Sequence, residues 1–198
     1  MQERAVDAGA GCGLRATSFK PTSGHFPVCP QLAARNSKFT SYNGGVPFRI
    51  RPFEKADFDT LWRIDQACFD PQLAYSRPEM AFYIRRPGSF TLVAEADAEI
   101  LGFIVAETRG KSGHIITIDV VAEARRAGVG SALLRDAEDQ LLRAGARAVA
   151  LETPVNNAAA IRFYKQKGYF VEKTVTGYYS GQLDALVMAK ELARPVVG

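Results

Sequence analysis

Arg125-Arg126-Ala127-Gly128-Val129-Gly130-Ser131 is a basic, glycine-containing stretch that separates two segments of different pattern. The apolar run 115–121 precedes it, and an amphipathic segment that begins near Gly128 follows it. This order predicts a strand, a loop and a helix. Because the first N–H groups of a helix lack intrahelical partners and lie at the positive end of the helix dipole, such a loop is suited to bind phosphate.

Three kinds of loop fit parts of this pattern. A nucleotide P-loop needs Gly-x-x-x-x-Gly-Lys-Ser/Thr, which the sequence lacks. A dinucleotide-binding loop would use Gly128, Gly130 and an acid at Glu152, but Leu133 stands where its third glycine belongs. A glycine-rich turn before an ordinary amphipathic helix is the structural alternative. The loop alone therefore leaves its ligand open.

A second pattern lies further along the chain. Residues 146–153 read as a strand, and Asn157 is placed to cap a helix that ends near residues 167–169. With this helix, the chain resembles the GCN5-related N-acetyltransferase (GNAT) superfamily. The coenzyme A loop of that family, Gln/Arg-x-x-Gly-x-Gly/Ala, is matched by Arg125, Gly128 and Gly130. Its motif Asn-x-x-Ala-x-x-x-Tyr-x-x-x-Gly-Phe/Tyr is matched by Asn157, Ala160, Tyr164, Gly168 and Tyr169.

The resemblance extends over roughly residues 48–192 and is closest to the ribosomal-protein-alanine N-acetyltransferase branch. The features shared with that branch are Leu151-Glu152, the run Asn157 to Ile161, Tyr178-Tyr179 and Asp184-Ala185. It implies an α/β (α+β) fold with a mixed central sheet of about seven strands and about four flanking helices.

Local patterns agree with this fold. Strands are predicted at 48–52, 89–95 and 100–108, with a closing hairpin at 169–176 and 184–190, and helices at 55–69 and 78–85, the latter capped by Ser76. Residues 1–47 read as a disordered or loosely attached tail, and 193–198 as a C-terminal tail. The composition of the first tail weakly resembles that of a transit peptide, and a start site assigned too far upstream would explain this segment equally well.

The resemblance implies acetyl-coenzyme A as cosubstrate, with no metal. The backbone of Ile118, Asp119 and Val120 would hold the pantetheine arm as an added strand does. The further residues expected to contact this cosubstrate are Arg125, Arg126, Ala127, Gly128, Val129, Gly130, Ser131 and Asn157.

Two side chains are predicted to be catalytic. An α-amino group has an ordinary pKa of about 8, against about 10.4 for lysine, so a modest base can deprotonate a protein N-terminus. Glu152, at the end of a strand beside the cosubstrate site, is the candidate base, and a solvated or ion-paired acid is its structural alternative. Tyr164 is the candidate proton donor to the leaving thiolate, and a core aromatic is its alternative.

The acceptor is expected to contact aromatic side chains from two loops. They are Phe69, Tyr75, Tyr178 and Tyr179, each of which packing would explain as well. Pro154 departs from the branch pattern because it has no N–H to pair with a bound peptide. His114 reads by default as a surface or strand-start histidine.

Charge and composition restrict the partners. The net charge is +4, of which residues 1–47 carry +3, so the folded part has no electrostatic footprint for nucleic acid. The sequence has no apolar run of membrane-spanning length. Cys12, His25 and Cys29 fit no standard zinc spacing, Cys68 reads as packing, and three separated cysteines suggest a reducing, cytoplasmic setting. We expect a monomer or weak dimer.

The resemblance therefore implies an N-acetyltransferase that acts by direct transfer, with protein N-termini as acceptors and a ribosomal protein as a candidate acceptor. A small-molecule amine acceptor and a non-catalytic acyl-coenzyme A-binding domain are the alternatives.

Overall fold

The computed structural model describes residues 14–15, 39–40 and 47–192. Its helices are α1 (Phe58–Cys68), α2 (Arg77–Arg85), α3 (Val129–Arg143) and α4 (Ala158–Gln166), with 3-10 turns η1 (Lys55–Asp57) and η2 (Ala122–Ala124). Its strands are β1 (Leu14–Arg15), β2 (Phe39–Thr40), β3 (Phe48–Pro52), β4 (Ser89–Ala96), β5 (Glu99–Arg109), β6 (Ser112–Val120), β7 (Ala148–Pro154), β8 (Phe170–Tyr179) and β9 (Leu183–Glu191).

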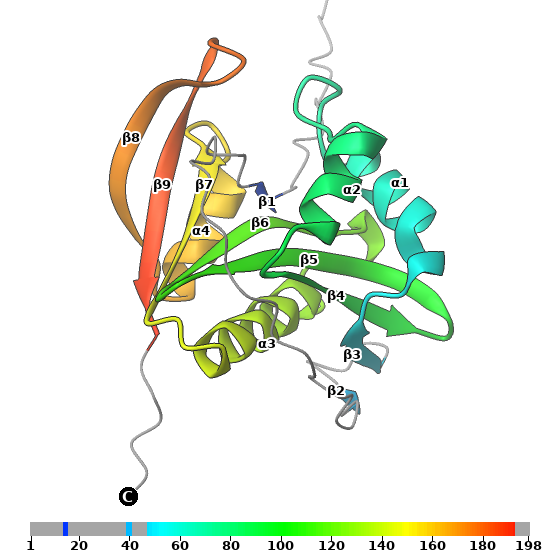
Figure 1. Ribbon diagram of the computed structural model, residues 1–198. Coiled ribbons are helices and arrows are strands. Elements are labelled where there is room, and N and C mark those ends of the chain that lie inside the picture. The colour runs from blue at the N-terminus through cyan, green and yellow to red at the C-terminus, as the bar shows by residue number, and fades with distance from the viewer. Residues whose placement is uncertain (1–13, 16–38, 41–46, 193–198) are drawn as a thin grey trace, which may run out of the picture.

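The strands form one mixed sheet in the order β2-β3-β4-β5-β6-β7-β9-β8, and β1 pairs with β6 (Figure 1). Within the described residues, β6 and β7 pair in parallel and all other strand pairs are antiparallel. The predicted mixed sheet of seven strands, β3 to β9, with four helices is confirmed. Two short strands from the segment before residue 47 extend it; the rest of that segment lies outside the described residues.

Helices cover both faces of the sheet (Figure 1). One core lies between the sheet and α3 and α4, and it includes Ile104, Ile115, Leu133, Leu141 and Tyr164. The other lies under α1 and α2, and it includes Leu61, Met80, Phe103 and Ile116. Because side chains alternate along β5 and β6, neighbouring residues of one strand serve opposite cores.

The predicted helix starts are confirmed by their caps. Ser76 forms a reciprocal capping box with Glu79 at the start of α2. Oδ1 of Asn157 accepts a hydrogen bond of 3.0 Å from the Ala160 N–H and caps α4. Gly128 precedes α3 with φ +89°, a left-handed conformation that favours glycine.

Two strands differ most from their predicted bounds. β6 begins at Ser112, not at residue 115, because a tight turn through Gly110 (φ +63°) lets β5 and β6 pair from Arg109 and Ser112 onward. β8 continues to Tyr179, past the predicted end at residue 176, because its register with β9 shifts between Val175 and Tyr179.

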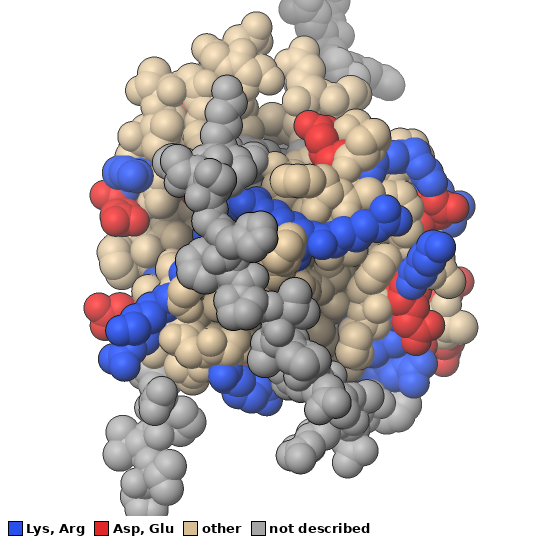
Figure 2. Space-filling view, in the orientation of Figure 1, with Lys and Arg blue, Asp and Glu red and all other residues tan. Residues whose placement is uncertain are grey.

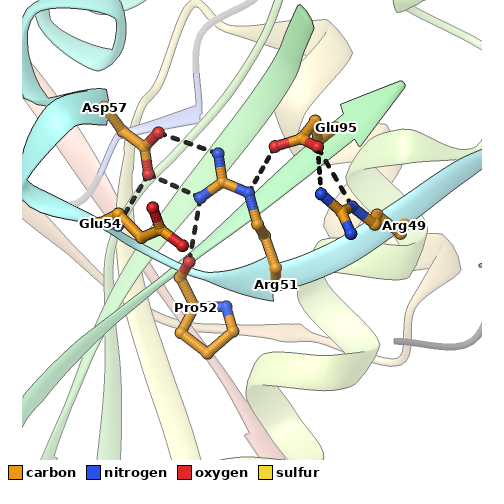
Figure 3. A network of polar contacts seen from close by, with 6 residues as sticks. All are labelled: Arg49, Arg51, Pro52, Glu54, Asp57 and Glu95. Atoms are coloured by element: carbon orange, nitrogen blue, oxygen red, sulfur yellow. Dashed lines mark hydrogen bonds and ion pairs between the residues drawn. The ribbon is translucent and has the colours of Figure 1, made fainter. Parts of the chain in front are cut away.

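A partly buried ion-pair network joins β3, β4 and η1 (Figure 3). Arg51 contacts Asp57 at 2.7 Å and Glu95 at 2.5 Å, and Arg49 contacts Glu95 at 2.6 Å. The Arg51 guanidinium holds the pKa of Asp57 below its ordinary value, and Arg49 with Arg51 does the same for Glu95. The network therefore fastens the first strand of the domain to its neighbour.

In the part of the chain that the structure describes, no helix is long and apolar enough to cross a membrane.

Candidate functional site

The predicted phosphate-binding loop is bent by two left-handed residues, Arg126 (φ +64°) and Gly128 (φ +89°). No described side chain caps the N-terminus of α3, and the first turn of α3 contains no acidic residue. Its leading N–H groups therefore face a position where an anion would complete their hydrogen bonding. The other loop residues, Ala127, Val129, Gly130 and Ser131, lead into this first turn. Figure 2 shows a band of Lys and Arg side chains across the face between α2 and α3.

Arg125 points back to the strand that precedes the loop. Its Nε donates to the Val120 carbonyl at 3.2 Å, and its guanidinium lies 3.8 Å from Sγ of Cys68. Burial, together with Asp119 nearby, raises the pKa of the Cys68 thiol to about 11. Arg125 thus braces the loop against α1, and Cys68 is a packing residue with an unreactive thiol.

β6 and β7 diverge beside this loop. Their pairing ends at His114 and Ala150, although β6 continues to Val120 and β7 to Pro154. The edge of β6 that includes Ile118, predicted to hold the pantetheine arm, is paired with β1 through Leu14. β1 contacts both diverging strands. The opening thus accepts an extended backbone as an added strand, as expected for a pantetheine arm.

Glu152 lies at this opening and has a partner that sequence reasoning missed. Its Oε2 is 2.9 Å from Nε2 of His114, whose side chain is 12% exposed. Nδ1 of His114 lies 3.4 Å from Oε1 of Glu107. Burial disfavours the charged imidazolium, but the two carboxylates outweigh burial and raise the pKa of His114 above its ordinary value.

The default interpretation of His114 as a surface or strand-start residue was wrong about its surroundings. His114 is inside strand β6, between β5 and β7, and it joins carboxylates from both neighbours. The available sequence signal was Gly110, which permits a two-residue turn after Arg109; a strand begun at Ser112 instead of residue 115 places Glu107 directly opposite His114.

Tyr164 lies in the core between the sheet and α4. Its side chain is 1% exposed, and its ring centroid is 5.4 Å from that of Tyr169. Asn157 caps the same helix. Both predicted residues are thus carried by α4, one at its start and one two turns later.

The predicted acceptor residues come from two segments that meet. A cavity of about 240 Å³ lies between the α1–α2 loop and the β8–β9 hairpin. It is lined by Asp70, Gln72, Leu73, Tyr179, Ser180, Gln182 and Leu183. Tyr179 therefore lies at this cavity, and Tyr178 packs against it with ring centroids 5.1 Å apart.

Phe69 and Tyr75 come before and after the loop residues that line the cavity, and both are buried. The Tyr75 ring lies 5.1 Å from that of Tyr83, and its backbone N–H donates to Asp65 at 2.8 Å. The Tyr75 carbonyl accepts from Trp62 Nε1 at 3.1 Å and from Gln66 Nε2 at 2.9 Å. Tyr75 therefore anchors the loop, and the side chains that line the cavity come from its neighbours.

Among the described residues, no group of three or more His, Cys, Asp or Glu side chains could hold a metal ion. Cys12, His25 and Cys29 lie outside those residues.

Comparison with known proteins agrees with this fold. An N-acetyltransferase of Methanocaldococcus jannaschii, described as uncharacterized, is 34% identical over 143 residues, which are 72% of this chain and 90% of that protein. An N-alpha-acetyltransferase of Sulfurisphaera tokodaii is 29% identical over 171 residues, covering 78% of this chain and 99% of the relative. The crystal structure of Ard1 from Thermoplasma volcanium is 27% identical and aligns with a TM-score of 0.67 over 74% of this chain and 99% of its own. The model of the acetyltransferase (GNAT) family matches residues 58–169, and the chain belongs to that family.

Proposed function

We propose that this protein is an acetyl-coenzyme A-dependent N-alpha-acetyltransferase that acetylates the α-amino group of protein N-termini. The observation that carries the proposal is the Glu152–His114 pair, which lies where β6 and β7 diverge in a chain of this acetyltransferase family. Relatives that are N-alpha-acetyltransferases support this acceptor class.

Acetyl-coenzyme A supplies an acetyl group already activated as a thioester. The bare N-terminus of α3 fits its pyrophosphate, since helix N–H groups and nearby arginines favour an anion. The β6 edge at Ile118, Asp119 and Val120 is proposed to hold the pantetheine arm, and the pairing of β1 with Thr117 and Ile118 supports this because it is an added strand on the same edge. Asn157 is proposed to contact the same cosubstrate from the start of α4.

Glu152 and His114 together accept the proton that the α-ammonium group must lose. Nε2 of His114 and Oε2 of Glu152 lie 2.9 Å apart, so a proton taken from the ammonium group is shared between the two side chains. The raised pKa of His114 brings this affinity closer to that of an α-amino group, whose ordinary pKa is about 8. The neutral amine then attacks the thioester carbonyl, and no acyl-enzyme is formed.

Tyr164 is proposed to donate a proton to the departing thiolate. The hydroxyl is carried by the helix that Asn157 starts, so cosubstrate contact and proton donor share one rigid element. Its burial also suits a core role, which makes Tyr164→Phe the decisive variant.

The cavity between the α1–α2 loop and the β8–β9 hairpin is proposed to receive the first residues of the acceptor. Tyr178 and Tyr179 would contact the peptide, while Phe69 and Tyr75 support the opposite wall. The narrower resemblance to ribosomal-protein-alanine N-acetyltransferases makes a ribosomal protein our predicted acceptor. A cytoplasmic setting, a monomer or weak dimer, and a folded domain at 48–192 likewise stay predictions.

The test is acetyl transfer measured by product mass on three sets of acceptors: peptides with free N-termini, the same peptides blocked at the N-terminus but containing lysine, and small amines. We expect acetylation of the free N-termini alone, with large losses of kcat for Glu152→Gln and Tyr164→Phe. Acetylation confined to small amines would overturn the acceptor class, and unchanged kcat in both variants across the pH range would overturn the mechanism.

A further inference from the structure

Glu107 lies on the opposite side of His114 from Glu152. In the antiparallel register of β5 and β6, Glu107 and His114 are direct partners, while His114 pairs with Ala150 on β7. The imidazole therefore lies between two carboxylates, with Nδ1 3.4 Å from Glu107 and Nε2 2.9 Å from Glu152. The three side chains come from three adjacent strands of one sheet.

The two carboxylates have different surroundings. The Glu107 side chain is 2% exposed, against 15% for Glu152. Two arginines compensate the buried charge: Nε of Arg86 lies 3.3 Å from Glu107, and Arg109 forms a second ion pair with it. Burial by itself would raise the pKa of Glu107, but His114, Arg109 and Arg86 hold it below its ordinary value. Glu107 is therefore a permanent negative charge that faces Nδ1 and is shielded from the acceptor.

We propose that Glu107 is a positioning residue that stabilises the imidazolium of His114, the form in which the Glu152–His114 pair holds the proton taken from the substrate. This inference rests on the proposed function. The Glu107 carboxylate lies 3.4 Å from Nδ1 and forms no hydrogen bond with it, but at this distance its negative charge attracts a positive imidazole strongly. The charge of Glu107 therefore stabilises the imidazolium that forms when the proton arrives.

In the described structure two carboxylates contact His114, Glu107 from β5 and Glu152 from β7. Two arginines contact Glu107: Arg109, also from β5, and Arg86, the residue after α2. The two carboxylates favour the imidazolium, and the two arginines weaken the effect of Glu107. Removing Glu107 or Arg109 should therefore move the proton affinity of His114 in opposite directions.

The experiment measures that affinity directly. The chain contains two histidines, so the variant His25→Gln leaves a single imidazole signal in a proton NMR titration. In this background we expect Glu107→Gln to lower the pKa of His114 by about 1 unit, the size that one nearby charge produces. Arg109→Gln should raise it by roughly half as much. Glu99→Gln, at the exposed start of β5, makes the same chemical change as Glu107→Gln and should leave the titration unchanged.

The same variants predict the pH profile of kcat/KM. Its acidic limb should move to lower pH in Glu107→Gln and to higher pH in Arg109→Gln, each by the amount that His114 shifts. The plateau of Glu107→Gln should fall about tenfold, because the pair has become a weaker base. A residue with a merely structural role would lower the rate at every pH and leave the limb in place.

Three results would overturn the proposal. The first is an unchanged pKa of His114 in both variants, and the second is a shift of this pKa in the same direction in both. The third is an acidic limb of the kcat/KM profile that does not move with the pKa of His114. If Glu107→Gln does not fold, Arg109→Gln still decides the sign, because the Arg109 side chain is 38% exposed. If peptides are not acetylated, the proposed acceptor class is wrong. The NMR titration of His114, and the pH profile of kcat/KM measured with the amine that is acetylated, still test the role of Glu107.

Discussion

The contact between His114 and Glu152 predicts that these residues act as one unit. We consider His114→Gln, Glu152→Gln and the double variant. A hydrogen bond that involves a charged partner contributes roughly 1.5–3 kcal/mol, and the 2.9 Å contact of these half-buried side chains is of that kind. If it is expressed fully in the transition state, its loss in His114→Gln lowers kcat by about 10- to 150-fold.

Glu152→Gln removes the group that meets the ammonium and should cost about 10²- to 10⁴-fold, the range for a general base. Because His114 acts through Glu152, the double variant should be close to Glu152→Gln alone, not to the product of the two losses. The assay follows release of the coenzyme A thiol at pH 8 with a saturating peptide, and thermal unfolding confirms that each variant is folded.

Glu172→Gln, on an exposed position of β8, is the matched control and should behave as wild type. Losses that multiply in the double variant would refute the reasoning, since they would mean that the two residues contribute independently. An unchanged kcat in His114→Gln would refute it as well.

Three further predictions concern the cosubstrate site and the fold. A Cβ at Gly130 would lie no closer than 3.7 Å to its neighbours, so Gly130→Ala should keep the KM for acetyl-coenzyme A within about twofold. Gly128 has φ +89°, so Gly128→Ala should strain the loop by about 1 kcal/mol. We therefore expect Gly128→Ala to raise this KM and to lower the unfolding temperature. Removing residues 1–16, and with them β1, should lower that KM, because β1 is paired with the edge of β6 that would hold pantetheine; an unchanged KM and binding constant would contradict this. In denaturant titrations Arg51→Ala should cost about 1–3 kcal/mol, because it removes the ion-pair partner of Asp57 and one of the two arginines that contact the partly buried Glu95. Arg49→Ala, whose side chain is 43% exposed, should cost less than about 1 kcal/mol. Since both acids have lowered pKa values, this stabilisation should be lost only as the pH falls below about 4, and equal losses in the two variants would contradict the assignment.

Features that depend on local sequence could be predicted. Gly128 and Asn157 determine the starts of α3 and α4 through backbone conformation and a cap within three residues, so their sequence signals were sufficient. The mixed sheet followed from strand patterns on either side of these helices.

Features that depend on distant segments were harder to predict. The partnership of His114 with Glu152 requires β6 and β7, which α3 separates, to pair in one particular register. Tyr75 was predicted to contact the acceptor, but its ring packs against Tyr83 of α2. The sequence of the loop does not indicate how α2 packs against it. The direction in which Arg125 points depends likewise on the Val120 carbonyl and on Cys68 from α1.

The fastening of the α1–α2 loop has a consequence for the kinetics of acceptor binding. Asp65, Trp62 and Gln66 hold the backbone of Tyr75 from both sides, so this wall of the cavity already has its shape before a peptide arrives. Ordering a free residue costs roughly 1–2 kcal/mol of conformational entropy. In this loop the entropy is lost when the protein folds and not when the peptide binds. Peptide association should therefore proceed in one step, with a rate that rises linearly with peptide concentration and does not level off at a slow loop closure.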